Sequence, residues 1–155
     1  MTGLLVSETF RAVAVAFLAL AGTLGWMSLR AAGTPVGTPG RLVAEFRVLR
    51  FAALLLALTA GASIGITAAR EQIPAGALEV SLAIGFFVLA AVALTKEPAQ
   101  ALTMLAAGFA AHALLDVAHR PGLLSPDLAP RWFYVSCAIY DVAVGALCYL
   151  PLFRR

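Results

Sequence analysis

Five long apolar runs, separated by short connections rich in proline, glycine and charge, dominate this chain of 155 residues. Each run holds roughly 18 to 25 residues, which as a helix suffices to cross a hydrocarbon layer about 30 Å thick. Charged residues make up only 12% of the chain, about half of the roughly 25% found in soluble domains. We therefore expect one domain, residues 1–155, that is an all-α integral membrane bundle of about five transmembrane helices.

Turn-forming sequences separate the expected helices. The segments AAGTPVGTPG, REQIPAG, TKEP and RPGLLSPDLAPR combine the residues that break helices with charged flanks. Between them we expect transmembrane spans at about residues 4–29, 41–69, 77–95, 99–119 and 132–153. At the start of the second span, Arg41 and Glu45 are four residues apart, a spacing that favours an ion pair.

The basic residues predict an orientation. The chain has 11 Lys and Arg residues, and alternation of five spans divides them seven to four. Seven share one side: Arg30, Arg41, Arg47, Arg50, Lys96, Arg154 and Arg155. The positive-inside rule then places the N-terminus outside and the C-terminus in the cytoplasm, in what we expect to be a bacterial inner membrane. Membrane lipids are expected partners and nucleic acid is not, because no basic patch with interleaved aromatic residues is present.

Ionisable residues near the end of the fourth span are the strongest functional signal. In AHALLDVAHR, the residues His112, Asp116 and His119 are spaced i, i+4 and i+7, so they share one helical face. Asp141 lies about nine residues inside the fifth span, and Glu79 begins the third. Span alternation brings all five into the same membrane half. Because ionisable groups at membrane depth need a partner or a task, we expect a polar cavity in the outer leaflet.

Acid–base catalysis on a hydrophobic small-molecule substrate is the chemistry that these residues favour. In a low-dielectric cavity the neutral form of a carboxyl group is favoured, so it can donate a proton at neutral pH. We expect Asp141 to be the acid, Asp116 with His112 to be base and orienter, and Glu79 to be a secondary acid. The candidate substrate-binding residues are His119, Tyr134, Trp132 and Tyr140.

A histidine and an acid four residues apart on one helix, here His112 and Asp116, occur with a second acid on another helix, here Asp141. This combination is similar in chemical logic to that of the emopamil-binding sterol isomerases and the integral-membrane terpene cyclases. The resemblance lies in residue types and helix placement, and the flanking motifs of those families are absent. It implies an isomerase or cyclase that acts on an isoprenoid or sterol-like lipid.

Three other accounts of the same residues stay open. In a non-enzymatic scaffold or lipid-binding protein, the polar groups would only hold helices together. In a small proton-coupled transporter, intramembrane acids would carry protons, and a homo-oligomer could complete the path. A metal centre would use His112, Asp116 and His119, a two-histidine, one-carboxylate set, although we predict no metal and no other cofactor.

Overall fold

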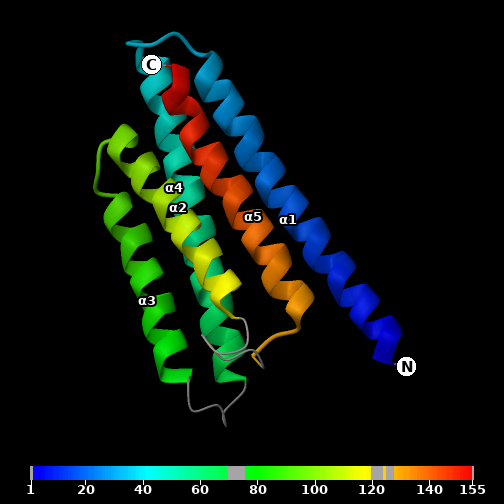
Figure 1. The fold of residues 1–155 in the computed structure, drawn as a ribbon. Coiled ribbons are helices and arrows are strands. Elements are labelled where there is room, and N and C mark those ends of the chain that lie inside the picture. The colour runs from blue at the N-terminus through cyan, green and yellow to red at the C-terminus, as the bar shows by residue number, and fades with distance from the viewer. Residues whose placement is uncertain (1, 70–75, 120–123, 125–127, 155) are drawn as a thin grey trace.

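The computed structural model describes residues 2–69, 76–119, 124 and 128–154, and these are helical throughout apart from short turns. Five helices run alternately up and down, and the two chain ends lie at opposite ends of the molecule (Figure 1). They are α1 (Thr2–Gly33), α2 (Pro39–Ala68), α3 (Gly76–Ala93), α4 (Pro98–Ala118) and α5 (Arg131–Tyr149), followed by the 3-10 helix η1 (Leu150–Arg154). Each of the five is long and apolar enough to cross a membrane. The expected all-α bundle of membrane-spanning helices is confirmed.

Proline and small polar residues set the helix ends. Pro39 and Pro98 stand in the first turns of α2 and α4, where a missing backbone N–H has no cost. Thr38 caps α2, because its side chain accepts a hydrogen bond from the backbone N–H of Arg41 at 3.2 Å. The last expected span reached residue 153, but α5 ends at Tyr149 and becomes 3-10 helical. Pro151 lacks the N–H that would continue the α-helical bonding.

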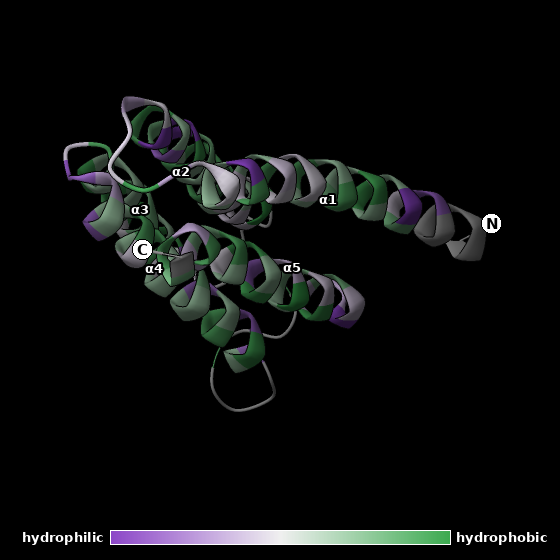
Figure 2. Ribbon diagram, turned by 90° about the horizontal axis from the view of Figure 1, so that it is seen from above, coloured by the Kyte–Doolittle hydropathy of each residue, from purple (hydrophilic) through white to green (hydrophobic). Residues whose placement is uncertain are grey.

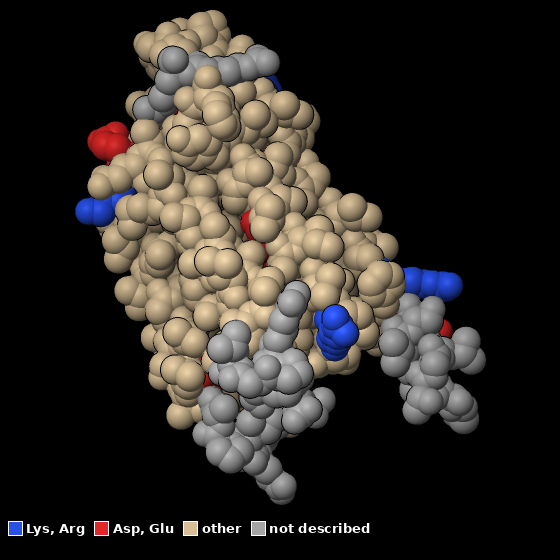
Figure 3. All heavy atoms as spheres, viewed as in Figure 1, with Lys and Arg blue, Asp and Glu red and all other residues tan. Residues whose placement is uncertain are grey.

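Large apolar side chains cover the outside of the bundle as well as its interior. Examples that are at least half exposed come from every helix: Leu18, Leu54, Phe87, Leu114 and Ile139. Figure 3 shows that charged side chains on one face are few and scattered, apart from a small acidic spot near the middle. Such a surface would aggregate in water but is matched to lipid.

Close contacts between α4 and α5 form the tightest part of the bundle. Gly145 on α5 makes the approach possible, because an added Cβ would lie 3.2 Å from the carbonyl oxygen of Ala106 and 3.4 Å from Cβ of Phe109. Small residues serve this purpose in membrane helices generally. The remaining helices complete a shared core that includes Leu56, Leu102 and Val144.

The first helix has two different halves. Its C-terminal half is packed into the bundle, where Leu24, Ser28 and Ala31 are fully buried. Its N-terminal half diverges from the bundle, as the two perpendicular views show (Figures 1 and 2), and keeps ring contacts to α5 through Phe10 and Phe17. Val15 and Leu18 in that half are 67% and 75% exposed. This divergence leaves room for a cavity at one end of the bundle.

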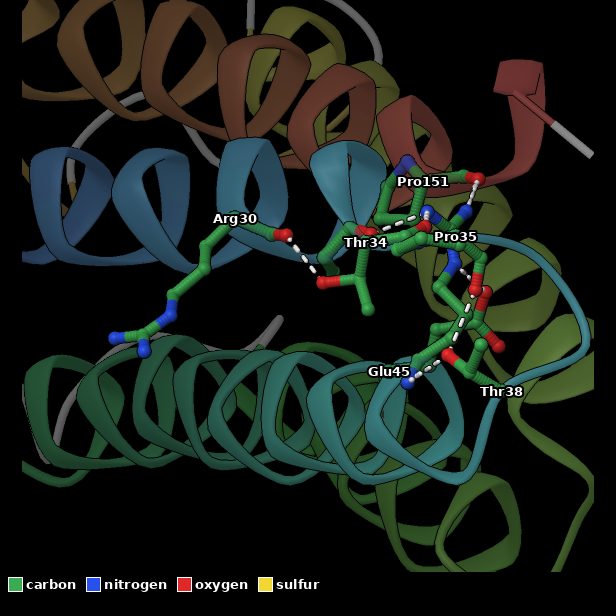
Figure 4. A network of polar contacts seen from close by, with 8 residues as sticks. Arg30, Thr34, Pro35, Thr38, Glu45 and Pro151 are labelled. Carbon is green, nitrogen blue, oxygen red and sulfur yellow. Dashed lines mark hydrogen bonds and ion pairs between the residues drawn. The ribbon is translucent and has the colours of Figure 1, made fainter.

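At the opposite end, a buried arginine joins three segments of the chain (Figure 4). Arg41 donates from Nε to Glu45 Oε1 at 2.7 Å, so the ion pair expected from the sequence spacing is present. Its two terminal nitrogens donate to the backbone carbonyls of Ala31, Thr34 and Pro151. We call Arg41, Glu45 and these carbonyls the Arg41 cluster. It ties the end of α1 and the start of α2 to η1.

Candidate functional site

Three ionisable side chains from α4 and α5 meet inside the bundle. His112 Nδ1 lies 2.7 Å from Asp141 Oδ2 and 3.7 Å from Asp116 Oδ2. Each residue offers one atom that could ligate a metal ion, and these three atoms lie within 4.8 Å of one another. Asp141 is completely buried, and His112 and Asp116 are 7% and 8% exposed. We call these three residues the deep cluster. The sequence paired His112 with Asp116, but the nearer partner is Asp141 from the next helix.

Helix packing explains how Asp141 reaches His112. Asp141 stands one turn before Gly145, the residue at which α5 makes its close approach to α4. His112 stands about one turn after Phe109, which Gly145 contacts. The ring of Phe86, from α3, meets the His112 ring edge-on at 5.0 Å. The imidazole is therefore fixed both by a hydrogen bond and by an aromatic wall.

A second histidine–carboxylate pair lies about 10 Å further along α4, from the seven-residue offset between the histidines. His119 Nε2 is 3.0 Å from Glu79 Oε1, and its Nδ1 is 2.8 Å from the carbonyl of Leu115. A carbonyl only accepts, so Nδ1 carries a hydrogen and donates it to Leu115, while Nε2 faces the Glu79 carboxyl group. The His119 ring also stacks on Tyr134 at 4.3 Å. We call Glu79 and His119 the outer pair.

A cavity of about 260 Å³ connects the two groups, and all five helices contribute to its wall. Its volume lies just below the range of roughly 300–1,000 Å³ usual for small-molecule sites. His112 and Asp116 of the deep cluster line it, and so do both members of the outer pair. Asp141 is not among the described residues of the wall. It contacts His112 from the protein side, which suits an orienting role better than the direct acid role expected from its depth.

The rest of the wall is apolar and aromatic, with one polar stripe. Five rings face the cavity, those of Phe17, Phe86, Phe133, Tyr134 and Tyr140. The stripe consists of Thr59, Ser63 and Thr67 on α2, whose hydroxyls donate to carbonyls one turn earlier at 2.9–3.1 Å. Their oxygen lone pairs remain able to accept a hydrogen bond from a ligand. The sequence did not predict that α1 and α2 contribute to the cavity wall. Nothing in these apolar helices marks the face that points inward.

The remaining predicted residues are placed differently from one another. Tyr140 is buried in the cavity wall and stacks on Phe17 at 4.3 Å. Trp132 contacts Phe10 at 5.4 Å and is not among the described wall residues. His119 belongs to the outer pair and not to the group of possible metal ligands. The three atoms that could ligate a metal ion together come from His112, Asp116 and Asp141, in place of the expected set of two histidines and one carboxylate. Whether any metal binds stays a prediction.

Charge balance indicates what the deep cluster can do. Two carboxylates and one neutral imidazole have a net charge of −2, so the cluster becomes neutral when it binds two further protons. Two arrangements satisfy this count: one carboxylic acid beside an imidazolium–carboxylate pair, and two carboxylic acids beside a neutral imidazole. Net charge in an apolar cavity is costly, so this neutral state is favoured. Both arrangements hold a proton donor and a proton acceptor within one cluster, and His112 and Asp116 of that cluster line the hydrophobic cavity.

Comparison with known proteins adds no family to this picture. No family model matches the chain, and no curated protein or solved structure is significantly similar to it. The functional conclusion therefore rests on the chemistry of the residues around the cavity.

Proposed function

We propose that the protein is a membrane enzyme that isomerises or cyclises an unsaturated lipid, isoprenoid or sterol-like, by general acid–base catalysis. The observation that carries this proposal is the deep cluster, whose His112 and Asp116 face an apolar, aromatic-lined cavity. A scaffold would need the polar contacts but not the cavity beside them. A carboxylic acid can donate the proton, and the carboxylate that it leaves can accept one, with His112 as its neighbour in the wall.

The reaction conserves atoms and electrons. Asp116, as the carboxylic acid, gives its proton to one carbon of a C=C bond, and the π electrons form the new C–H bond. The neighbouring carbon becomes a carbocation, which the faces of aromatic rings such as Phe86 and Tyr140 stabilise. The Asp116 carboxylate then removes a proton from an adjacent carbon, and a shifted C=C bond results. In a cyclase, a second C=C bond attacks the cation before the proton leaves.

The other polar residues have supporting roles in this proposal. Asp141 orients His112 and balances its charge through the 2.7 Å contact, and the imidazole lies 3.7 Å from Asp116 Oδ2. The outer pair and the hydroxyl stripe lie along the same cavity and would bind a hydroxyl or other polar end of the lipid. A substrate with one polar end and an unsaturated chain fits this distribution.

Deuterium incorporation tests the proposed reaction. Purified protein is incubated in D₂O with farnesol, geranylgeraniol or a sterol alkene in mixed micelles, and the lipids are analysed by mass spectrometry. One deuterium should enter each product molecule. Asp116→Asn should lower the rate about 10²- to 10⁴-fold, the usual contribution of a positioned acid or base. Glu97→Gln, at an exposed acid outside the cavity, should leave the rate unchanged.

Two results would contradict acid–base catalysis. One is an Asp116→Asn variant that melts like the parent and incorporates deuterium at the same rate. The other is an Asp116→Asn variant that no longer folds in detergent, which would favour a scaffold. For Asp141 as a positioning residue, Asp141→Asn should lower kcat while KM stays within about two-fold, since uniform binding is unaffected.

A metal-dependent enzyme is the second candidate. The three donor atoms within 4.8 Å favour it, together with two buried oxygens. In the part of the chain that the structure describes, Asp116 Oδ2 and Asp141 Oδ1 have no hydrogen-bond partner. Carboxylate and imidazole ligands suit zinc, manganese or iron. Elemental analysis of purified protein decides: a stoichiometric metal that is lost in His112→Ala would replace the metal-free mechanism.

We also infer the orientation in the membrane, with the N-terminus outside and the C-terminus in the cytoplasm of a bacterial inner membrane. The support is the seven-to-four division of basic residues, although Arg70, Arg120 and Arg155 lie outside the described residues. The deep cluster and the outer pair would then lie in the outer half. Reporter fusions at the two termini test this: activity of a periplasmic reporter at the C-terminus would reverse the orientation.

A further inference from the structure

A second hollow lies at the other end of the bundle, between the end of α1 and the start of α2. It has a volume of about 510 Å³ and differs from the first in its chemistry. Its wall contains Arg30 from α1 and Arg47 from α2, together with Trp26, Met27, Val43 and Ala44. We call it the arginine groove. It shares no lining residue with the cavity of the proposed enzyme.

The groove has an unbalanced positive charge. Arg30 and Arg47 are both exposed, and the described residues that line the groove include no acid. The nearest acid in sequence, Glu45, is buried and accepts a hydrogen bond from Arg41. Two guanidinium groups on facing helices, with no acid among the described residues that line the groove, are complementary to a phosphate.

Trp26 holds one of these arginines in place. The guanidinium carbon of Arg30 lies 5.6 Å from the centre of the Trp26 ring, a cation–π distance. Figure 4 shows the Arg30 side chain reaching from α1 into the space between α1 and α2. Trp26 is 62% exposed, and tryptophan is enriched at the headgroup level of membranes. The pair therefore marks the depth of lipid headgroups.

Helix length supports the same depth. The 30 residues of α2 span about 45 Å at 1.5 Å per residue, which exceeds a hydrocarbon core of about 30 Å. About 15 Å of the helix exceeds the core, and Arg47 stands about 12 Å from its N-terminal end. Arg47 is therefore at the headgroup level when the excess lies at this end, which is the end that Trp26 marks. The apolar side chains of Met27 and Val43 line the same groove, and the exposed side chain of Leu29 stands nearby on α1. An acyl chain can follow these side chains while a phosphate contacts the arginines.

We propose that the arginine groove binds the phosphate of an anionic phospholipid, with Arg30 and Arg47 as its two cationic contacts. The lipid would bridge α1 and α2 at the end where the Arg41 cluster joins them. This inference is independent of the proposed enzyme activity, because the two sites share no residue.

Selective lipid retention tests the groove. Protein is isolated from bicelles that contain equal amounts of phosphatidylglycerol and phosphatidylcholine, and the bound lipid is quantified by mass spectrometry. The parent should retain phosphatidylglycerol in excess. Arg30→Gln combined with Arg47→Gln should weaken this binding roughly ten- to thirty-fold, from about 1 kcal/mol per arginine near a surface. Arg47→Gln alone should weaken it about five-fold.

The matched control is Arg11→Gln combined with Arg50→Gln, which removes the same charge from two exposed arginines outside the groove. It should retain phosphatidylglycerol like the parent. Equal loss in both double variants would overturn the proposal, because net charge alone would then explain retention. Displacement of the lipid by an equal concentration of inorganic phosphate would overturn it as well, since acyl contacts would then contribute nothing.

Discussion

The Arg41 cluster and the deep cluster both bury charge in an apolar bundle, but they treat their polar atoms differently. Each of the three guanidinium nitrogens of Arg41 has a hydrogen-bond acceptor, and the acceptors come from α1, α2 and η1. In the deep cluster, within the described part of the chain, one oxygen each of Asp116 and Asp141 has no hydrogen-bond partner. Thr34 of the first cluster lines the arginine groove, and His112 and Asp116 of the second line the apolar cavity, so the two clusters differ in their hydrogen bonding and not in whether a hollow adjoins them.

This contrast separates two uses of buried charge. A fully hydrogen-bonded ion pair can hold segments together, and removal of one partner leaves the other stranded. A cluster with unused acceptors beside a cavity stabilises the fold less than it could, which is typical of functional sites. Burial alone therefore does not identify a catalytic residue in a membrane protein.

The largest effect on stability is expected at Arg41. Arg41→Gln removes the charge and most of the donors that serve Glu45 and three carbonyls. We expect a loss of about 3–5 kcal/mol in the free energy of unfolding, the usual cost of breaking a buried pair. Unfolding in mixed detergent measures it. A loss below about 1 kcal/mol would show that the Arg41 cluster contributes no more than a surface ion pair, and the contrast with the deep cluster would then fail.

The second largest loss of stability is expected at the contact between α4 and α5 that positions the deep cluster. Gly145→Val puts a branched side chain where a backbone carbonyl lies 3.2 Å from the first added carbon. Overpacking of this kind costs about 1–3 kcal/mol. The control is Gly85→Val, because a Cβ at Gly85 meets no described atom within 4 Å. Equal melting temperatures for the two variants would show that α4 and α5 can separate freely.

A smaller effect on stability is expected inside the deep cluster. In Asp141→Asn the side-chain oxygen can still accept the hydrogen bond from His112, so the free energy of unfolding should change by less than about 1 kcal/mol. Thermal unfolding compared with Arg41→Gln sharpens the contrast between the clusters. A loss as large as that of Arg41→Gln would make both clusters structural.

The smallest effect is expected in the outer pair. Glu79→Gln keeps a group that can hydrogen-bond His119 Nε2, 3.0 Å away, and should change the free energy of unfolding by about 0.5 kcal/mol or less. Deuterium incorporation should fall only a few-fold, since Glu79's partner His119 stands seven residues, about 10 Å, from His112 along the helix axis. A loss of activity equal to that of Asp116→Asn would move the reacting centre to the outer pair.

Span positions could be predicted from the sequence, because apolar run length and helix-breaking residues depend on local sequence alone. Alternation of spans was enough to bring Glu79 and Asp141 to the end of the bundle that holds His112. Helix rotation could not be predicted. The lipid-facing surface is as apolar as the core, so no stripe tells which face of α1 or α2 points inward.

The partners within the site escaped prediction for a related reason. The i, i+4 spacing offered both the Arg41–Glu45 and the His112–Asp116 pairs. The first was found at 2.7 Å, while Asp141 displaced Asp116 as the nearest partner of His112. That outcome depends on Gly145 letting α5 come close, an interhelical fit that sequence spacing does not encode. The contact between Arg41 and Pro151 is equally out of reach from local patterns.

The hydrogen bond from Arg41 to the carbonyl of Pro151 joins residues 110 positions apart. During synthesis, Arg41 emerges and enters the bilayer long before its acceptor exists. Until the last span is inserted, one guanidinium nitrogen of Arg41 lacks that acceptor. Because an unpaired charged donor is costly in an apolar medium, this end of the first helical hairpin is expected to stay in contact with water. The arrival of residue 151 thus supplies the hydrogen bond that fixes the start of α2 to η1. A protein truncated before residue 151 would lack this hydrogen bond.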